Sequence, residues 1–278
     1  MAISPEPVAQ ATGGASGTAV ADVLRVASVN YFNAKPLIAG LADRPEVDLA
    51  LDVPSKLLAR LQDETADVAL LPVIDYQRLD GATLLPAAGG IGCDGPTLTV
   101  RIFSQTPLDR IDRLCCDPDS HTSVALARIV MKRLHGRVPE LAPLHAVTGA
   151  PGEARLLIGD KVVCEEPVGF EHQLDLGGAW KKLTGLPFVF ACWTARAGVE
   201  LGGLVETLAE CRRRGLGMVD QLIKKHAIPR GWPAGIAHRY LTDYLHYEVG
   251  PRQLEAIERY HQYAAEDGII ESAKPLAF

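Results

Sequence analysis

The sequence predicts an α/β protein with two lobes and a helical C-terminal region. Three features of the 278-residue chain indicate this fold. Strand and helix patterns alternate over about 23–95, and a second block of the same kind covers about 105–190. From Val199 onward the apolar residues recur at helical spacing. Strands that alternate with helices favour a parallel sheet with helices packed on it.

The first block contains three predicted strands, over 24–29, 47–51 and 67–72. Pro36 suits the first turn of a helix after the first strand. A second helix is predicted to begin at Pro54, because the leucines that follow it fall on one face. The order β-α-β-α-β therefore indicates a parallel sheet in the first lobe.

The second block and the C-terminal region continue the pattern. Strands are predicted over 98–104, 111–116, 156–160 and 186–193, and helices over 124–135, about 201–214, 218–226, 234–244 and 251–267. The apolar strands 98–104 and 186–193 are the candidates for the two crossings between lobes. We therefore expect a first lobe of 23–98 and 194–278 and a second lobe of 99–193. Open sheets bind ligands at strand carboxyl ends and helix N-termini, so a ligand cleft is expected between the lobes.

Composition excludes several functional classes. The net charge is −6, without the basic excess of a nucleic-acid-binding protein. The longest apolar runs are shorter than a membrane helix. The six cysteines form no C-x-x-C pair and have no histidine at zinc-ligand spacing, so we expect reduced, mostly buried thiols and no bound metal. Residues 1–22 are rich in small residues and lack Lys and Arg, which predicts a disordered tail and no secretory signal. We expect a cytoplasmic protein with no nucleic-acid or membrane partner.

Several polar residues lie where a ligand site is expected. Thr122 and Ser123 stand at the start of the predicted helix 124–135, where hydroxyls and free N–H groups can hold a carboxylate. The alternative is a simple N-cap, in which Ser120 or Asp119 bonds the backbone. His121 lies among them. Histidine is the side chain whose unperturbed pKa, about 6.5, is closest to neutral, and we expect His121 at the edge of the cleft.

Two further candidates follow predicted strands. Asp160 ends the strand 156–160, where it can orient a donor, act as a base or cap the next helix. Asn33 follows the first strand on a turn bounded by Pro36, and it can orient a substrate or simply form the turn.

Six sequence blocks, in order, resemble those of the chorismate dehydratases of the futalosine route to menaquinone. Residues 28–37 resemble the opening S-x-x-Y-x-N-A/S-R/K-P-L, and 67–76 are similar to D-V-A-L-I-P-V-x-x-Y. Residues 91–96 resemble I-x-x-x-G-P, and 119–126 match S-x-T-S-x-A-L. The later blocks are similar at 157–160 and 175–190, so the resemblance holds from about residue 24 to 270.

This resemblance implies a periplasmic-binding-protein-like type II fold with its ligand between the lobes. It implies a carbon–oxygen lyase that removes water from chorismate, a dicarboxylate, to give 3-[(1-carboxyvinyl)oxy]benzoate without a cofactor. Asn33 and Thr99 would be catalytic, with Thr99 in the place of the family's crossing-strand Ser. The residues expected to bind substrate are Tyr31, Lys35, Gly95, His121, Thr122, Ser123 and Asp160.

The chain departs from the family pattern at two places. The family commonly has Arg–Ser in the crossing strand where this chain has Leu98–Thr99, and Lys35 stands where Arg is common. Loss of the cation at Leu98 leaves two alternatives open. One is a non-catalytic binder of a small anion with the same fold, and the other is a paralogous enzyme of the pathway that acts on a nucleoside-derived intermediate. The sequence indicates no oligomeric state.

Overall fold

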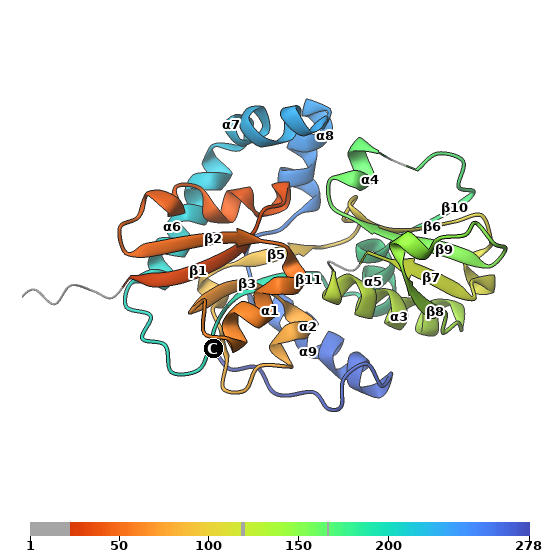
Figure 1. The fold of residues 1–278 in the computed structure, drawn as a ribbon, viewed down its shortest axis with the longest axis horizontal. Coiled ribbons are helices and arrows are strands. Elements are labelled where there is room, and N and C mark those ends of the chain that lie inside the picture. Colours follow the sequence, from red (N-terminus) through yellow and green to blue (C-terminus); the bar gives the residue numbers. More distant parts are fainter. Residues whose placement is uncertain (1–22, 118–119, 166) are drawn as a thin grey trace, which may run out of the picture.

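The fold consists of two sheets, each flanked by helices (Figure 1). A computed structural model describes residues 23–117, 120–165 and 167–278. The predicted disordered tail at 1–22 and Asp119 lie outside the described residues. The predicted two-lobed α/β architecture is confirmed by the separate positions of the two sheets in Figure 1.

The first sheet has the strand order β2-β1-β3-β11-β4, and β5 also pairs with β11. Strands β1 (Leu24–Val29), β2 (Val47–Asp52) and β3 (Val68–Pro72) are parallel, which confirms the prediction for this part of the chain. Strand β11 (Phe188–Ala195) runs antiparallel to β3. The short strands β4 (Thr83–Leu84) and β5 (Gly90–Cys93) are also antiparallel to β11.

The second sheet has the order β10-β6-β9-β7-β8. Its strands are β6 (Val100–Ser104), β7 (Arg113–Cys116), β8 (Glu140–Pro143), β9 (Glu153–Ile158) and β10 (His172–Asp175). Strand β6 is antiparallel to β9 and β10, whereas β7 is parallel to β8 and β9. Helices α3 (His121–His135), α4 (Lys161–Cys164) and α5 (Leu176–Thr184) belong to this lobe (Figure 1).

Sheet membership differs from the expected lobe boundary at one place. We expected residues 99–193 in the second lobe, but β11 pairs only with strands of the first sheet among the described strands. Strands β6 and β11 thus each lie within one sheet. The chain passes from one lobe to the other in the segment before each of these strands. The reason is that an uninterrupted apolar run marks a buried strand without indicating which sheet it joins.

The remaining α-helices, together with one 3₁₀ helix, lie with the first lobe (Figure 1). A 3₁₀ helix, η1 (Phe32–Ile38), follows β1, and α1 (Pro54–Gln62) and α2 (Val73–Tyr76) follow β2 and β3. The C-terminal region contains α6 (Leu204–Gly217), α7 (Val219–Leu222), α8 (Ala234–Arg239) and α9 (Pro251–Glu266). Two π-helical segments, Ile223–Ala227 and Tyr240–Tyr244, extend α7 and α8. The predicted helical C-terminus is therefore confirmed.

An aromatic cluster ties the lobes together. The Trp180 ring of α5 lies 5.3 Å from Phe188 of β11 and 6.1 Å from Tyr260 of α9, measured between centroids. Phe188 and Tyr260 are 5.1 Å apart, and all three side chains are buried. Burial of such rings is worth roughly 1.5–3 kcal/mol each, so this cluster holds α5 of the second lobe against the first.

Candidate active site between the two lobes

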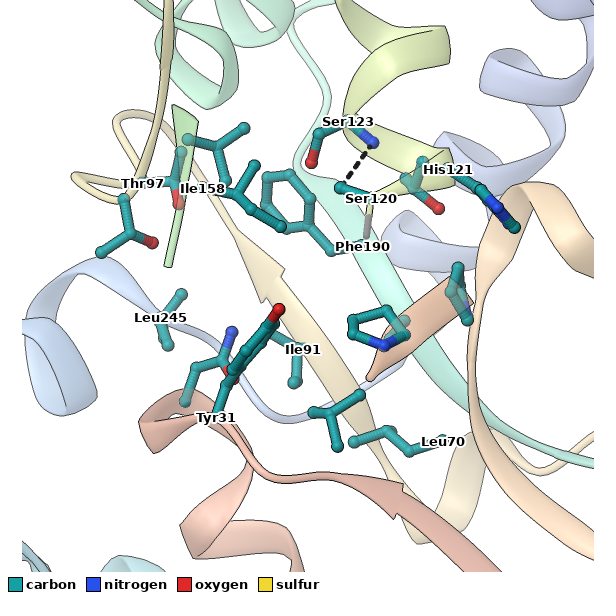
Figure 2. Close-up of a pocket in the computed structure, with 18 of the residues that line it drawn as sticks. Tyr31, Leu70, Ile91, Thr97, Ser120, His121, Ser123, Ile158, Phe190 and Leu245 are labelled. Carbon is teal, nitrogen blue, oxygen red and sulfur yellow. Dashed lines mark hydrogen bonds between the residues drawn. The ribbon is translucent and has the colours of Figure 1, made fainter. Parts of the chain in front are cut away.

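A hollow lies between the two sheets (Figure 2). Both lobes contribute to its walls. Its lining residues are Val29, Tyr31, Asn33, Pro54, Leu70, Pro72, Ile91, Thr97, Thr99, Val100, Ser120, His121, Thr122, Ser123, Ile158, Phe190, Ala191, Tyr240 and Leu245. In Figure 2 the Tyr31 hydroxyl points into this space from the first lobe, toward the side where Phe190 lies. Six of the nine predicted site residues therefore lie around one hollow.

Helix η1 brings Tyr31 and Asn33 to the wall because it begins directly after β1. The backbone of Asn33 is fixed, since the Tyr247 hydroxyl donates to its carbonyl oxygen over 2.9 Å. The amide oxygen Oδ1 of Asn33 is buried and has no hydrogen-bond partner among the described residues. A buried acceptor without a donor costs free energy, so this atom is suited to accept a hydrogen bond from a ligand.

A buried hydroxyl pair faces the hollow at Thr99 and Tyr240. Their oxygens are 2.8 Å apart, and both residues are almost fully buried. Burial raises the pKa of the Tyr240 phenol, and the hydrogen bond with Thr99 only partly offsets this effect. The phenol therefore keeps its proton near neutral pH and acts as a neutral hydrogen-bond donor.

The start of α3 forms the opposite wall. Ser120 is the N-cap, and its Oγ accepts from the Ser123 N–H over 3.3 Å, as the dashed line in Figure 2 shows. Thr122 Oγ1 lies 3.5 Å from the Ile74 N–H that donates to it. The capping alternative is thus present for Ser120, and the hydroxyl-bearing residues still line the hollow.

His121 lies at the edge of this wall. Its Nδ1 is 2.7 Å from Asp75 Oδ2 of α2, and the Asp75 side chain is completely buried. Arg78 also bonds this carboxylate, over 3.0 Å. Figure 2 shows the His121 ring turned away from Tyr31 and Phe190. This position is the edge position expected for His121, and its contact with Asp75 joins α3 to α2.

The segment before β6 is fixed by Asp175. The Asp175 carboxylate accepts from the N–H groups of Thr97 and Leu98 at 2.8–3.0 Å and also caps α5 through Gly178. Leu98 has a φ of 68°, the left-handed region that Leu rarely adopts. The carboxylate thus holds the crossing segment in a strained turn, which puts Thr97 and Thr99 on the hollow.

Three predicted site residues lie outside the lining. Gly95 sits in the crossing segment, with a φ of 135°. The Lys35 Nζ is buried and donates to Asn30 Oδ1 over 2.8 Å. Asp160 is the N-cap residue of α4 without a side-chain cap bond, and its Oδ2 lies 3.8 Å from Arg230 Nε. The roles assigned to all nine residues stay predictions.

Sequence reasoning missed Thr97 and Tyr240 as lining residues, and it assigned Phe190 mainly to the core, as one of four aromatic residues of which one could line the pocket. Thr97 lies before the predicted strand 98–104, and the positive φ of Leu98 breaks strand alternation there, so this pattern does not indicate it. Tyr240 is 141 positions from its partner Thr99, and nothing local to its sequence marks it.

The described part of the chain shows no group of three or more metal-ligating side chains that could hold an ion. None of the helices in that part is long and apolar enough to cross a membrane. The cytoplasmic location stays a prediction. The six cysteines are free thiols, and five of them are buried.

The architecture defines a class of protein. The chain is similar to a solved protein of Archaeoglobus fulgidus, at a TM-score of 0.70 and 17% identity, over 89% of this chain and 98% of that one. It is also similar to the periplasmic aliphatic sulphonate binding protein of Escherichia coli, at a TM-score of 0.62 and 13% identity, over 91% and 94% of the two chains. The predicted periplasmic-binding-protein-like fold is therefore confirmed.

Sequence comparison then gives the family. Residues 24–266 match the sequence model of a family described as menaquinone biosynthesis, and the chain belongs to that family. It is also 28% identical over 226 residues to the chorismate dehydratase of Thermus thermophilus. This alignment covers 73% of this chain and 81% of that protein. The resemblance seen in the sequence blocks is thus confirmed at the level of the family.

Proposed function

We propose that this chain is a chorismate dehydratase, a carbon–oxygen lyase that converts chorismate to 3-[(1-carboxyvinyl)oxy]benzoate and water. The observation that carries the proposal is that Asn33, Thr99 and Thr122, from three separate segments, line one hollow. The similarity to the Thermus thermophilus chorismate dehydratase supports the same reaction.

The hollow suits a ring with polar substituents. Its walls are mainly apolar, with Val29, Leu70, Ile91, Ile158 and Phe190 available to contact a ring. Apolar walls exclude water and strengthen each hydrogen bond inside. The hydroxyls at the start of α3 hold the ring carboxylate in this proposal, because a helix N-terminus favours an anion.

Dehydration breaks one C–H and one C–O bond of neighbouring ring carbons. The proton and the hydroxide leave together as water, and the electron pair of the C–H bond makes the ring aromatic. The departing oxygen needs hydrogen-bond donors as negative charge develops on it. The Thr99–Tyr240 pair offers a neutral, buried donor, and the unpartnered Oδ1 of Asn33 accepts the hydrogen bond that orients the ring hydroxyl. Neither the donation to the departing oxygen nor the orientation of the ring hydroxyl needs a cofactor.

The direct test is to incubate the purified chain with chorismate and to measure the aromatic product by liquid chromatography. Asn33→Ala should lower turnover about 100- to 1000-fold, the usual effect of removing one transition-state hydrogen bond, while the free energy of unfolding changes by less than about 1 kcal/mol. Gln62→Ala removes an exposed amide outside the hollow and is the matched control. Full activity in Asn33→Ala would refute the catalytic assignment.

A non-catalytic anion-binding function is the second candidate. It is favoured by Leu98, which stands where the family commonly has Arg and contributes no charge to the crossing segment. A ligand that binds only the native state raises its stability. Strong thermal stabilisation by chorismate, without any product at high protein concentration, would favour this candidate over the enzyme.

A further inference from the structure

A group of basic side chains lies beside the hollow, where the first lobe faces the second. It comprises Lys35, Lys225, His226 and Arg230, and we call it the basic cluster. Burial lowers the pKa of Lys35, and the charges of Arg230 and Lys225 lower it further. The pKa of His226 is lowered by burial and by the three other members. Three of these residues lie in the chain between α7 and α8. In Figure 1 this segment and α4 of the second lobe are both at the top of the molecule.

Lys35 is a buried cation whose hydrogen-bond partner is neutral. The residue is 6% exposed, and its Nζ donates to the amide oxygen of Asn30. Removing a charge from water is costly unless an opposite charge is supplied. An anion that enters beside Lys35 would supply that charge.

Arg230 has an unused donor in the same place. Its Nη2 donates to the Asn30 carbonyl oxygen over 3.3 Å, and its Nε lies 3.8 Å from Asp160. Its Nη1 is buried and has no hydrogen-bond partner in the described part of the chain. The planar guanidinium offers paired donors that match a carboxylate, so this donor is suited to a ligand oxygen.

The charges in this region do not balance. Lys35, Lys225 and Arg230 carry three positive charges, and Asp160 is the carboxylate that offsets them. Burial raises the pKa of Asp160, and the charges of Arg230 and Lys35 oppose this effect, so Asp160 is one carboxylate beside three basic side chains. An excess of one charge at a cleft attracts ligands of the opposite charge. The hollow itself has no Lys or Arg among its described lining residues, so it cannot neutralise a dianion alone.

The cluster borders the hollow through several short connections. Asn30, which binds Lys35 and Arg230, lies between the lining residues Val29 and Tyr31. Trp232, two residues after Arg230, stacks on the lining residue Tyr240 at a centroid distance of 5.0 Å. A ligand with its ring in the hollow can therefore extend a second anionic group toward the cluster.

We propose that Arg230 and Lys35, assisted by Lys225, form a second carboxylate subsite that binds the side-chain carboxylate of a dicarboxylate whose ring lies in the hollow. This inference rests on the proposed function, and it assigns the two carboxylates of the substrate to different lobes. The start of α3 binds one carboxylate, and the basic cluster of the first lobe binds the other.

The test compares a dicarboxylate with a monocarboxylate. The dissociation constants of 3-[(1-carboxyvinyl)oxy]benzoate and benzoate are measured by calorimetry on the whole chain and on Arg230→Gln. The variant should weaken the dicarboxylate about 10- to 100-fold, the usual worth of a charged hydrogen bond, and benzoate less than about threefold. Lys225→Gln removes an exposed member and should give a smaller loss in the same direction. Lys224→Gln removes the same charge from an exposed neighbour outside the cluster and should change neither constant.

The outcomes separate this inference from the proposed function. In one outcome the unmodified chain turns over chorismate, and its affinity for the dicarboxylate equals that of Arg230→Gln and Lys225→Gln. This outcome would overturn the subsite and leave the function intact. Selective loss of dicarboxylate binding without any turnover would support the subsite and refute the function. Absence of binding of either ligand to the unmodified chain would overturn the subsite.

Discussion

The two lobes meet in two regions of different character. One region, here called the α3 interface, joins α3 to α2 and α9. In it the Tyr260 hydroxyl donates to the Thr122 carbonyl oxygen over 2.9 Å, and Asp75 bonds His121. The other region holds the Asp160–Arg230 pair, whose closest charged atoms are 3.8 Å apart.

Burial distinguishes these regions. Tyr260 and the Asp75 carboxylate are completely buried, whereas the side chains of Asp160 and Arg230 are 26% and 32% exposed. Breaking buried hydrogen bonds costs stability, and exposed ion pairs contribute little. The comparison indicates that the α3 interface contributes more to stability than the Asp160–Arg230 region, which is the region where we propose the second carboxylate subsite. Four predictions test it.

The largest expected effect concerns the packing of α9 on α2, which supports the α3 interface. His261 is buried between Gln77 and the Val73 carbonyl, and burial lowers its pKa to about 4. The unfolded chain, with a pKa near 6.5, binds the proton more readily, so stability falls as the pH decreases from about 6.5 to 4. Urea unfolding should show a loss of about 2.5 kcal/mol between pH 7 and 4.5 that His261→Gln lacks. Parallel pH curves for the two proteins would contradict this.

Asp75→Ala should have the next largest effect. It leaves His121 and Arg78 without their shared carboxylate, and the partial exposure of both side chains limits the cost. We expect a loss of about 2 kcal/mol in the free energy of unfolding, measured in urea at pH 7. The control Asp63→Ala removes an exposed carboxylate and should change stability by less than about 0.5 kcal/mol. Equal losses in the two variants would remove the distinction between the α3 interface and the surface.

The structure also shows which parts of the fold a sequence can predict. Strands β1–β3 and helices α1 and α9 follow from apolar spacing and from the prolines that begin the helices. Helix α5 has the glycine pair 177–178, which disfavours a helix locally. Tertiary contact explains Gly177, because a Cβ there would lie 2.5 Å from the Gly95 carbonyl oxygen. Helix propensity therefore does not predict α5, because the close approach of the Gly95 backbone requires a glycine at position 177.

The candidate site divides in the same way. Asn33 and Thr122 were predicted because each lies within a short sequence block, and Thr99 because it takes the place of the family's crossing-strand Ser. All three line the hollow. Tyr240 and Arg230 come from the helical C-terminal region, where the residues around them have only the spacing of a packed helix. Their place beside the hollow depends on how that region packs on the first lobe, and a linear pattern does not contain this information.

Tyr260→Phe should have a smaller effect on the α3 interface. The change removes one buried hydroxyl and leaves the Thr122 carbonyl without that donor. We expect a loss of about 1 kcal/mol, seen as a lower urea midpoint with an unchanged slope. Tyr244→Phe removes an exposed hydroxyl that bonds Arg239, and its midpoint should stay nearly constant. A midpoint shift in Tyr244→Phe as large as that in Tyr260→Phe would contradict the role of burial.

Asp160→Asn should change stability least, because it breaks the partly exposed pair of the second region. We expect less than about 0.5 kcal/mol in urea unfolding. Its effect should instead appear in binding, since the change removes a negative charge next to the basic cluster. Two charges about 4 Å apart in water interact by about 1 kcal/mol, so affinity for 3-[(1-carboxyvinyl)oxy]benzoate should rise about fivefold. Weaker binding in this variant would show that Asp160 contacts the ligand directly as a donor or base, and would reverse the role given to it here.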